Sequence, residues 1–213
     1  MLKFTKKEVI YLIIAFIVLS FCFAISTVGT DFYGILSILP LVMVGVGIGC
    51  ISHETGHKFV AMKYGYQSEF ILWPIGLLIA FISSFFGMVL AFPGEARIYA
   101  DNISDEISGK IAIAGPMTNM ALALIFIVIA ALVYPLKFHS DIFNLIFFIG
   151  AVGFSVNSFL ATFNLLPIYS LDGTKVLKWN IGIWIVVFAI ALIMMLLSIS
   201  IGAENMVKLF IGM

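Results

Sequence analysis

Long apolar runs separated by short polar segments dominate this sequence. A continuous apolar helix of about 20 residues is long enough to cross the hydrocarbon core of a bilayer, which is about 30 Å thick. Five runs reach that length and predict membrane-spanning helices. They cover residues 9–29, 34–62, 110–134, 142–166 and 181–201.

A further apolar stretch, residues 70–92, has the length of a span but is interrupted by residues that break helices. The breaks are Trp73-Pro74, Gly76, Gly87 and Pro93-Gly94. Irregular backbone cannot face lipid, because its N–H and C=O groups would have no hydrogen-bond partners. We therefore expect 70–100 to be a small re-entrant or β-stranded segment, shielded by protein or lining a wet cavity. This interpretation gives five to six transmembrane helices in all.

Composition supports the same fold class. The chain has 213 residues, of which 63% are hydrophobic and 10% charged, and its mean hydropathy is +1.21. A soluble domain is nearer half apolar and a quarter charged. We therefore predict a polytopic α-helical membrane protein, with residues 1–213 forming a single integral-membrane domain in contact with the lipid bilayer. The net charge of zero gives no indication of nucleic-acid binding.

The run predicted as the second helix contains the pattern H-E-x-x-H, from His53 to His57. Residues four apart lie on one face of a helix, so the two imidazoles can bind one metal ion. Glu54 lies about 100° around the helix from His53, where it can act as a base on water at that metal. Nitrogen and oxygen ligands with this spacing suit catalytic zinc. Polar residues are costly in a lipid-length helix, which favours a functional site over a cluster that only ties helices together.

Two histidines need a third protein ligand to complete a catalytic zinc site. Among the acidic residues near predicted spans, Asp172 stands out because it lies in a turn, residues 167–175, that follows a polar stripe on the fourth span. The stripe contains Gly150, Gly153, Asn157, Ala161 and Asn164. Its asparagines are explained equally well by hydrogen bonds between helices or by contact with a substrate.

Topology tests this choice of ligand. If 70–92 does not cross the membrane, both histidines and Asp172 lie towards the same side, which also holds nine of the 11 basic residues. That bias agrees with the positive-inside rule and predicts a site nearer the cytosol. If 70–92 does cross, Asp172 lies on the opposite side from the histidines and the charge bias is lost. The nine basic residues on the side of the site are Lys3, Lys6, Lys7, Lys58, Lys63, Arg97, Lys110, Lys175 and Lys178. The two on the other side are Lys137 and Lys208.

Three blocks, in this order, resemble the site-2 proteases, a family of intramembrane zinc metalloproteases. They are His53 to His57, the G-P-x-x-N block Gly115 to Asn119, and an N-x-x-P block from Asn164 followed by Leu171-Asp172-Gly173. The resemblance implies one zinc ion per chain bound by His53, His57 and Asp172, with Glu54 as general acid and base. It also implies that Asn119 and Asn164 hold the substrate backbone, and that a membrane-embedded β segment follows the motif helix.

The sequence thus predicts a zinc-dependent metalloendopeptidase that cleaves within or near transmembrane segments of membrane proteins. The partner is a transmembrane protein or peptide, and the sequence indicates neither its identity nor the oligomeric state. One alternative is a zinc-binding membrane protein or transporter that uses the same histidines without a base. Another is a relative that binds membrane proteins without cutting them, but retention of the full set of ligands and base argues against it. The lack of a cleavable targeting sequence favours a prokaryotic plasma membrane.

Overall fold

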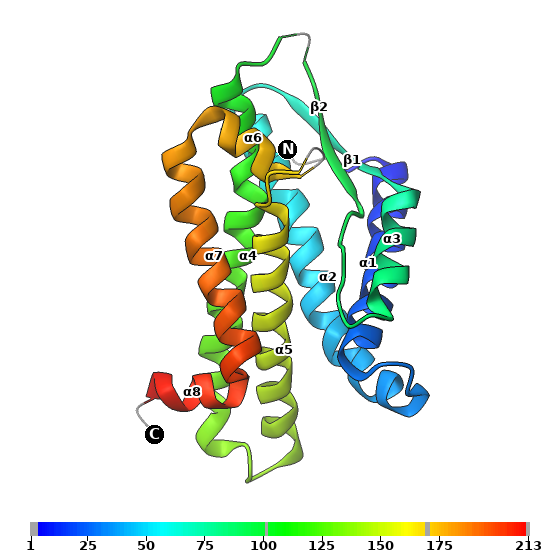
Figure 1. Ribbon diagram of the computed structural model, residues 1–213, viewed down its shortest axis with the longest axis vertical. Helices are drawn as coiled ribbons and strands as arrows, with labels where there is room; N and C mark the ends of the chain where they lie inside the picture. The colour runs from blue at the N-terminus through cyan, green and yellow to red at the C-terminus, as the bar shows by residue number, and fades with distance from the viewer. Residues whose placement is uncertain (1–3, 101, 169–170, 212–213) are drawn as a thin grey trace.

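The computed structural model describes residues 4–100, 102–168 and 171–211 (Figure 1). Within these ranges five helices are long and apolar enough to cross a membrane. They are α1 (Lys6–Val28), α2 (Phe32–Lys63), α4 (Asp105–Val133), α5 (Asp141–Asn164) and α7 (Ile181–Ile201). A small two-stranded sheet follows α2. The predicted fold class, a mostly helical chain with a small β element after the motif helix, is confirmed.

The segment that sequence reasoning expected to be re-entrant consists of β1 (Gln67–Leu72), α3 (Pro74–Ser84) and β2 (Gly94–Tyr99). The strands pair antiparallel, from Gln67 opposite Tyr99 to Leu72 opposite Gly94. The 11 residues of α3 extend only about 16 Å, which is too short to cross a bilayer core of about 30 Å. The chain therefore turns back, and β2 returns alongside β1 to the end of the bundle from which β1 started. Helix α3 packs beside α1 (Figure 1).

Three shorter helices lie at the two ends of the bundle: η1 (Tyr134–Leu136), α6 (Asp172–Trp179) and α8 (Ala203–Ile211). Figure 1 shows α6 at the end of the bundle where the two-stranded sheet lies, and α8 at the opposite end. The turn predicted at 167–175 includes the start of α6, whereas Tyr169 and Ser170 fall outside the described residues. This arrangement brings the start of α6 to the end of the bundle where α2 finishes.

Two helices begin at least three residues earlier than the apolar pattern predicts, because polar side chains cap them. Thr5 and Glu8 form a capping box, so α1 starts at Lys6 rather than at residue 9. The Ser104 side chain accepts a hydrogen bond from the Ile107 amide, so α4 starts at Asp105 rather than at residue 110. Hydrophobicity locates the part of a helix that meets lipid, whereas capping residues decide where the helix begins.

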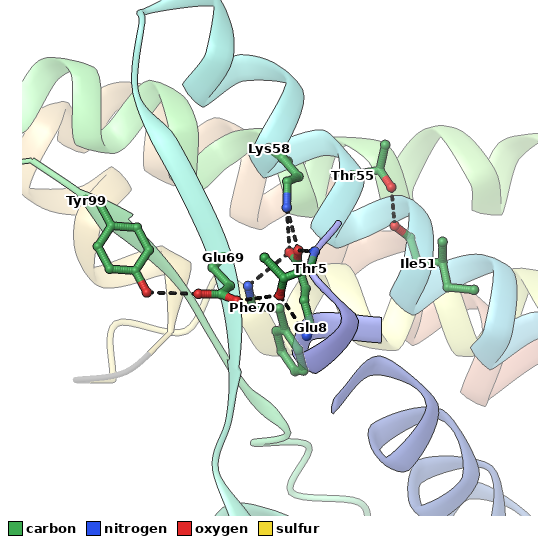
Figure 2. Close-up of polar contacts among 8 residues, drawn as sticks. All are labelled: Thr5, Glu8, Ile51, Thr55, Lys58, Glu69, Phe70 and Tyr99. Atoms are coloured by element: carbon green, nitrogen blue, oxygen red, sulfur yellow. Dashed lines mark hydrogen bonds and ion pairs between the residues drawn. The ribbon is translucent and has the colours of Figure 1, made fainter. Parts of the chain in front are cut away.

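A buried ion pair connects α1 to the motif helix (Figure 2). The Lys58 ammonium donates to both oxygens of Glu8, over 2.8 and 2.6 Å, and both side chains are almost fully buried. Glu8 also accepts a hydrogen bond from the Phe70 amide in β1. At the exposed edge, Glu69 accepts from the hydroxyls of Thr5 and Tyr99, and these two bonds lower the pKa of the Glu69 carboxyl. The contacts join α1, α2 and both strands.

This pair provides a stability prediction. Glu8→Gln leaves the Lys58 ammonium buried without a counter-charge, and we expect it to cost about 3–5 kcal/mol of unfolding free energy. Lys58→Met is expected to cost a similar amount, since it leaves the Glu8 carboxylate unpaired. The double variant should recover most of the loss, because it removes both charges. Reversible unfolding in mixed micelles measures these values. If the loss of unfolding free energy in the double variant equals the sum of the losses in the two single variants, the two side chains are not directly coupled.

Candidate metal centre

Three predicted ligands meet in the interior of the protein. His53 and His57 lie one turn apart on α2, and their Nε2 atoms are 3.0 Å apart. Oδ2 of Asp172, the first residue of α6, lies 3.2 Å from His53 Nε2 and 3.1 Å from His57 Nε2. All three side chains are buried. Within the part of the chain that the structure describes, these residues form the one cluster with the spacing of metal ligands.

One face of α4 orients both imidazoles. The backbone carbonyl of Ile111 lies 2.8 Å from His57 Nδ1, and Asn119 Oδ1 lies 2.5 Å from His53 Nδ1. These two residues and Gly115 are spaced by four, so they lie on one face of the helix. A Cβ at Gly115 would come within 2.6 Å of His53 Nε2. The G-P-x-x-N block thus supplies both room for the rings and a partner for His53.

The hydrogen bonds determine which ring atoms remain available. Carbonyl oxygens only accept, so Nδ1 of each histidine donates, and each neutral ring keeps its lone pair on Nε2. The Asp172 carboxylate likewise offers only lone pairs. Three buried lone-pair atoms that converge repel one another unless a cation lies among them. Zinc with nitrogen and oxygen ligands at about 2.0 Å in a tetrahedron separates those ligands by about 3.3 Å. The observed separations of 3.0 to 3.2 Å are close to this value, so the residues fit zinc.

The Leu-Asp-Gly turn holds Asp172 in place by packing against the end of α5. A Cβ at Gly173 would overlap the Leu165 carbonyl, so only glycine permits this approach. The same carbonyl accepts a hydrogen bond from the Trp184 indole over 2.8 Å. The Thr174 hydroxyl donates to the Ile168 carbonyl over 2.7 Å. These contacts hold the Asp172 carboxylate close to the Nε2 atoms of the two imidazoles.

A pocket opens onto the three converging side chains. Its lining includes Glu54 and Cys50 from α2, Asn164 from the end of α5, and residues 93–96 around the start of β2. Leu12, Ala15 and Leu19 of α1 form a further wall. The pocket therefore places the predicted base beside the candidate ligands, and an extended backbone strand runs along one side of it.

The structure places the two predicted substrate-binding asparagines differently. Asn164 is half-buried at the pocket, where its amide donates to the Leu160 carbonyl over 2.9 Å. Asn119 also lines the pocket but is fully buried, and its amide group already donates to the Gly49 carbonyl and to Asn157. Sequence reasoning missed the Ile111 carbonyl and the link through Asn157. The spacing of four from Gly115 to Asn119 is a sequence signal for the orienting face of α4, whereas the Ile111 backbone carbonyl leaves none.

Comparison with curated proteins finds relatives whose names describe zinc metalloproteases. MJ0611 of Methanocaldococcus jannaschii is 42% identical over 188 residues, which cover 87% of this chain and 91% of that protein. MJ0392 of the same organism is 28% identical over 69% of this chain, which spans 34% of its length. YwhC of Bacillus subtilis is 26% identical, over 67% of this chain and 70% of its own.

No protein-family model matches the sequence, and no solved structure matches it significantly. MJ0611 matches over nearly the full length of both chains.

Proposed function

Because the chain belongs to the site-2 protease-like family of zinc metalloproteases, we propose that it hydrolyses peptide bonds within or near transmembrane segments of other membrane proteins. The observation that carries this proposal is the buried convergence of His53, His57 and Asp172 beside Glu54. A soluble metalloprotease has no need to place such a site among helices that are apolar enough to cross a membrane. We infer one zinc ion per chain, held by these three side chains.

The chemistry divides between the metal and Glu54. When bound, zinc supplies a Lewis acid that polarises the scissile carbonyl and makes water a stronger nucleophile. Glu54 takes a proton from the attacking water and delivers it to the amine of the leaving peptide. His53 and His57 keep their Nε2 lone pairs towards the metal, because the Asn119 and Ile111 oxygens accept from their Nδ1 atoms. Asn164 lines the pocket, and we assign it the role of holding the substrate backbone.

The substrate must reach this site as extended chain, because the peptide bonds of a helix are hidden by its own hydrogen bonds and side chains. His53 lies ten residues before Lys63, the last residue of α2, or about 15 Å along the helix axis. Lys137 and Lys208, the basic residues assigned to the outer side, both pair with Glu204, which lies in α8 at the other end of the bundle. We propose that the site opens towards the cytosol in a multi-pass protein of a prokaryotic plasma membrane.

Metal removal tests the proposed function. The protein is reconstituted in liposomes with a peptide that contains one transmembrane segment, and mass spectrometry follows its products. Treatment with phenanthroline should abolish cleavage, and a stoichiometric addition of zinc should restore it, since the chemistry needs the metal. Zinc uptake into the same vesicles is followed with a trapped zinc dye. Cleavage that survives chelation overturns the proposal, as does zinc uptake without any cleavage, which is the result a transporter gives.

A further inference from the structure

A second layer of polar groups lies behind His53, and of its two members only Asn119 lines the pocket. Asn119 on α4 and Asn157 on α5 are both fully buried in the bundle, and the Asn119 amide donates to Asn157 Oδ1 over 2.9 Å. Asn157 is not among the residues that line the pocket. A buried amide in a membrane bundle is costly unless it has hydrogen-bond partners, and the geometry of these two amides indicates what they do.

Backbone carbonyls determine how the Asn157 amide is oriented. Its Nδ2 donates to the Gly153 carbonyl over 2.9 Å and to the Gly45 carbonyl over 3.3 Å. A carbonyl oxygen only accepts hydrogen bonds, so the NH₂ group must face these two oxygens, and Oδ1 must face α4. The backbone of α2 comes close at this point, since a Cβ at Gly49 would lie 2.7 Å from Asn157 Oδ1. The orientation of Asn157 is therefore set by main-chain atoms.

The orientation of Asn157 fixes that of the Asn119 amide, which in turn fixes the tautomer of His53. Asn119 Nδ2 lies between two acceptors, Asn157 Oδ1 and the Gly49 carbonyl, at 2.9 and 3.2 Å. Its NH₂ group faces them, so Oδ1 must point at His53 Nδ1. Because an amide oxygen only accepts, Nδ1 carries the ring proton and Nε2 keeps its lone pair. Rotating either amide by 180° would leave buried acceptors facing acceptors, which costs free energy.

We propose that Asn157 and Asn119 form a positioning relay that holds His53 in the tautomer able to bind metal through Nε2. This inference rests on the proposed zinc site and assigns Asn119 a role in positioning a ligand. Asn157 acts on the metal only through Asn119. Groups that fix a metal-binding histidine through its second nitrogen typically change metal affinity about 10–100-fold when they are removed.

The test measures metal binding rather than activity. Zinc affinity is measured by chelator competition in detergent, the visible absorption of the cobalt-substituted protein reports ligand geometry, and a melting curve monitors the fold. Asn119→Val should weaken zinc binding about 10–100-fold and alter the cobalt spectrum. Asn157→Val should weaken zinc binding about tenfold, the lower end of this range, because Asn119 remains. Asn119→Asp keeps an oxygen acceptor for His53 and should restore affinity to near the wild-type value even if the protein melts earlier.

Ser158→Ala is the matched control. Ser158 is a buried neighbour on α5 whose hydroxyl has no hydrogen-bond partner among the described residues, so zinc affinity should not change. If Asn119→Val and Asn157→Val only lower the melting temperature and keep wild-type zinc affinity and cobalt spectra, the asparagines merely pack helices and the relay is overturned. If Asn119→Asp binds zinc as weakly as Asn119→Val, the acceptor role is also overturned. A wild-type protein that binds no zinc overturns the proposed function together with the relay.

Discussion

Glu54→Gln is expected to lower peptide hydrolysis by about 10²- to 10⁴-fold, the usual contribution of a general acid and base, while zinc content stays at the wild-type level. The amide has nearly the same shape as the carboxylate but cannot take a proton from water. Glu54 lines the pocket beside the three candidate ligands, and it is absent from the ligand cluster itself. Rate measurements on a transmembrane peptide, paired with metal analysis of the same preparations, separate the two roles.

Thr55→Ala is the matched control for this prediction. Thr55 is the next residue of the motif, and its hydroxyl donates to the Ile51 carbonyl of its own helix over 2.7 Å (Figure 2). Its removal should leave both rate and zinc content near the wild-type values. A Glu54→Gln protein that loses its zinc would instead make Glu54 a ligand. One that still cleaves at the wild-type rate would exclude Glu54 as the base.

Gly115→Ala is expected to abolish stoichiometric zinc binding, a loss of more than about 100-fold in affinity, with activity lost in parallel. The added methyl group would come within 2.6 Å of Nε2 of His53 and of Cε1 of His57, in the space towards which the ligand atoms point. The rings must move for the methyl group to fit, and their hydrogen bonds to Ile111 and Asn119 oppose that movement. Alanine is the better helix former by about 1 kcal/mol, so helix propensity does not explain a loss.

Equilibrium dialysis against zinc, with a melting curve for each protein, checks this prediction. Gly182→Ala is the control, since a Cβ there meets only the Asn180 side chain at 3.3 Å and Gly182 is not among the residues that line the pocket. It should bind zinc normally. If Gly115→Ala binds zinc with wild-type affinity, then the close approach of α4 to the imidazoles is not a feature of the folded protein.

Sequence reasoning could predict the motif helix, the five long apolar helices and the segment that does not cross, because each leaves a signal in the order of residue types. Hydrophobic length identifies α1, α2, α4, α5 and α7. The breaks at Trp73-Pro74 and Pro93-Gly94 mark the starts of α3 and of β2. The distribution of basic residues placed Asp172 at the same end as the histidines, and the structure brings the three together.

Other features of the site could not be read from the sequence. The partner of His57 is the backbone carbonyl of Ile111, and every residue has such a carbonyl, so no side chain marks it. The polar stripe on α5 identified Asn157 as inward-facing, but the sequence left its partner open between a neighbouring helix and a substrate. The partner of Asn157 depends on how closely α2, α4 and α5 approach one another. The glycines allow a close approach, but they do not determine which helices meet. Helix starts also shifted, because Thr5 and Ser104 extend α1 and α4 beyond their apolar runs.

X-ray absorption at the zinc edge, measured on the purified wild-type protein, tests most directly whether His53, His57 and Asp172 share one metal ion. We expect one zinc per chain, with two imidazole nitrogens at about 2.0 Å and oxygen at about 2.0–2.2 Å. Asp172→Ala should lose the metal or the carboxylate contribution. A sulfur neighbour at about 2.3 Å would assign a ligand to Cys50, which also lines the pocket. That result, or a spectrum unchanged in Asp172→Ala, would contradict the proposed centre.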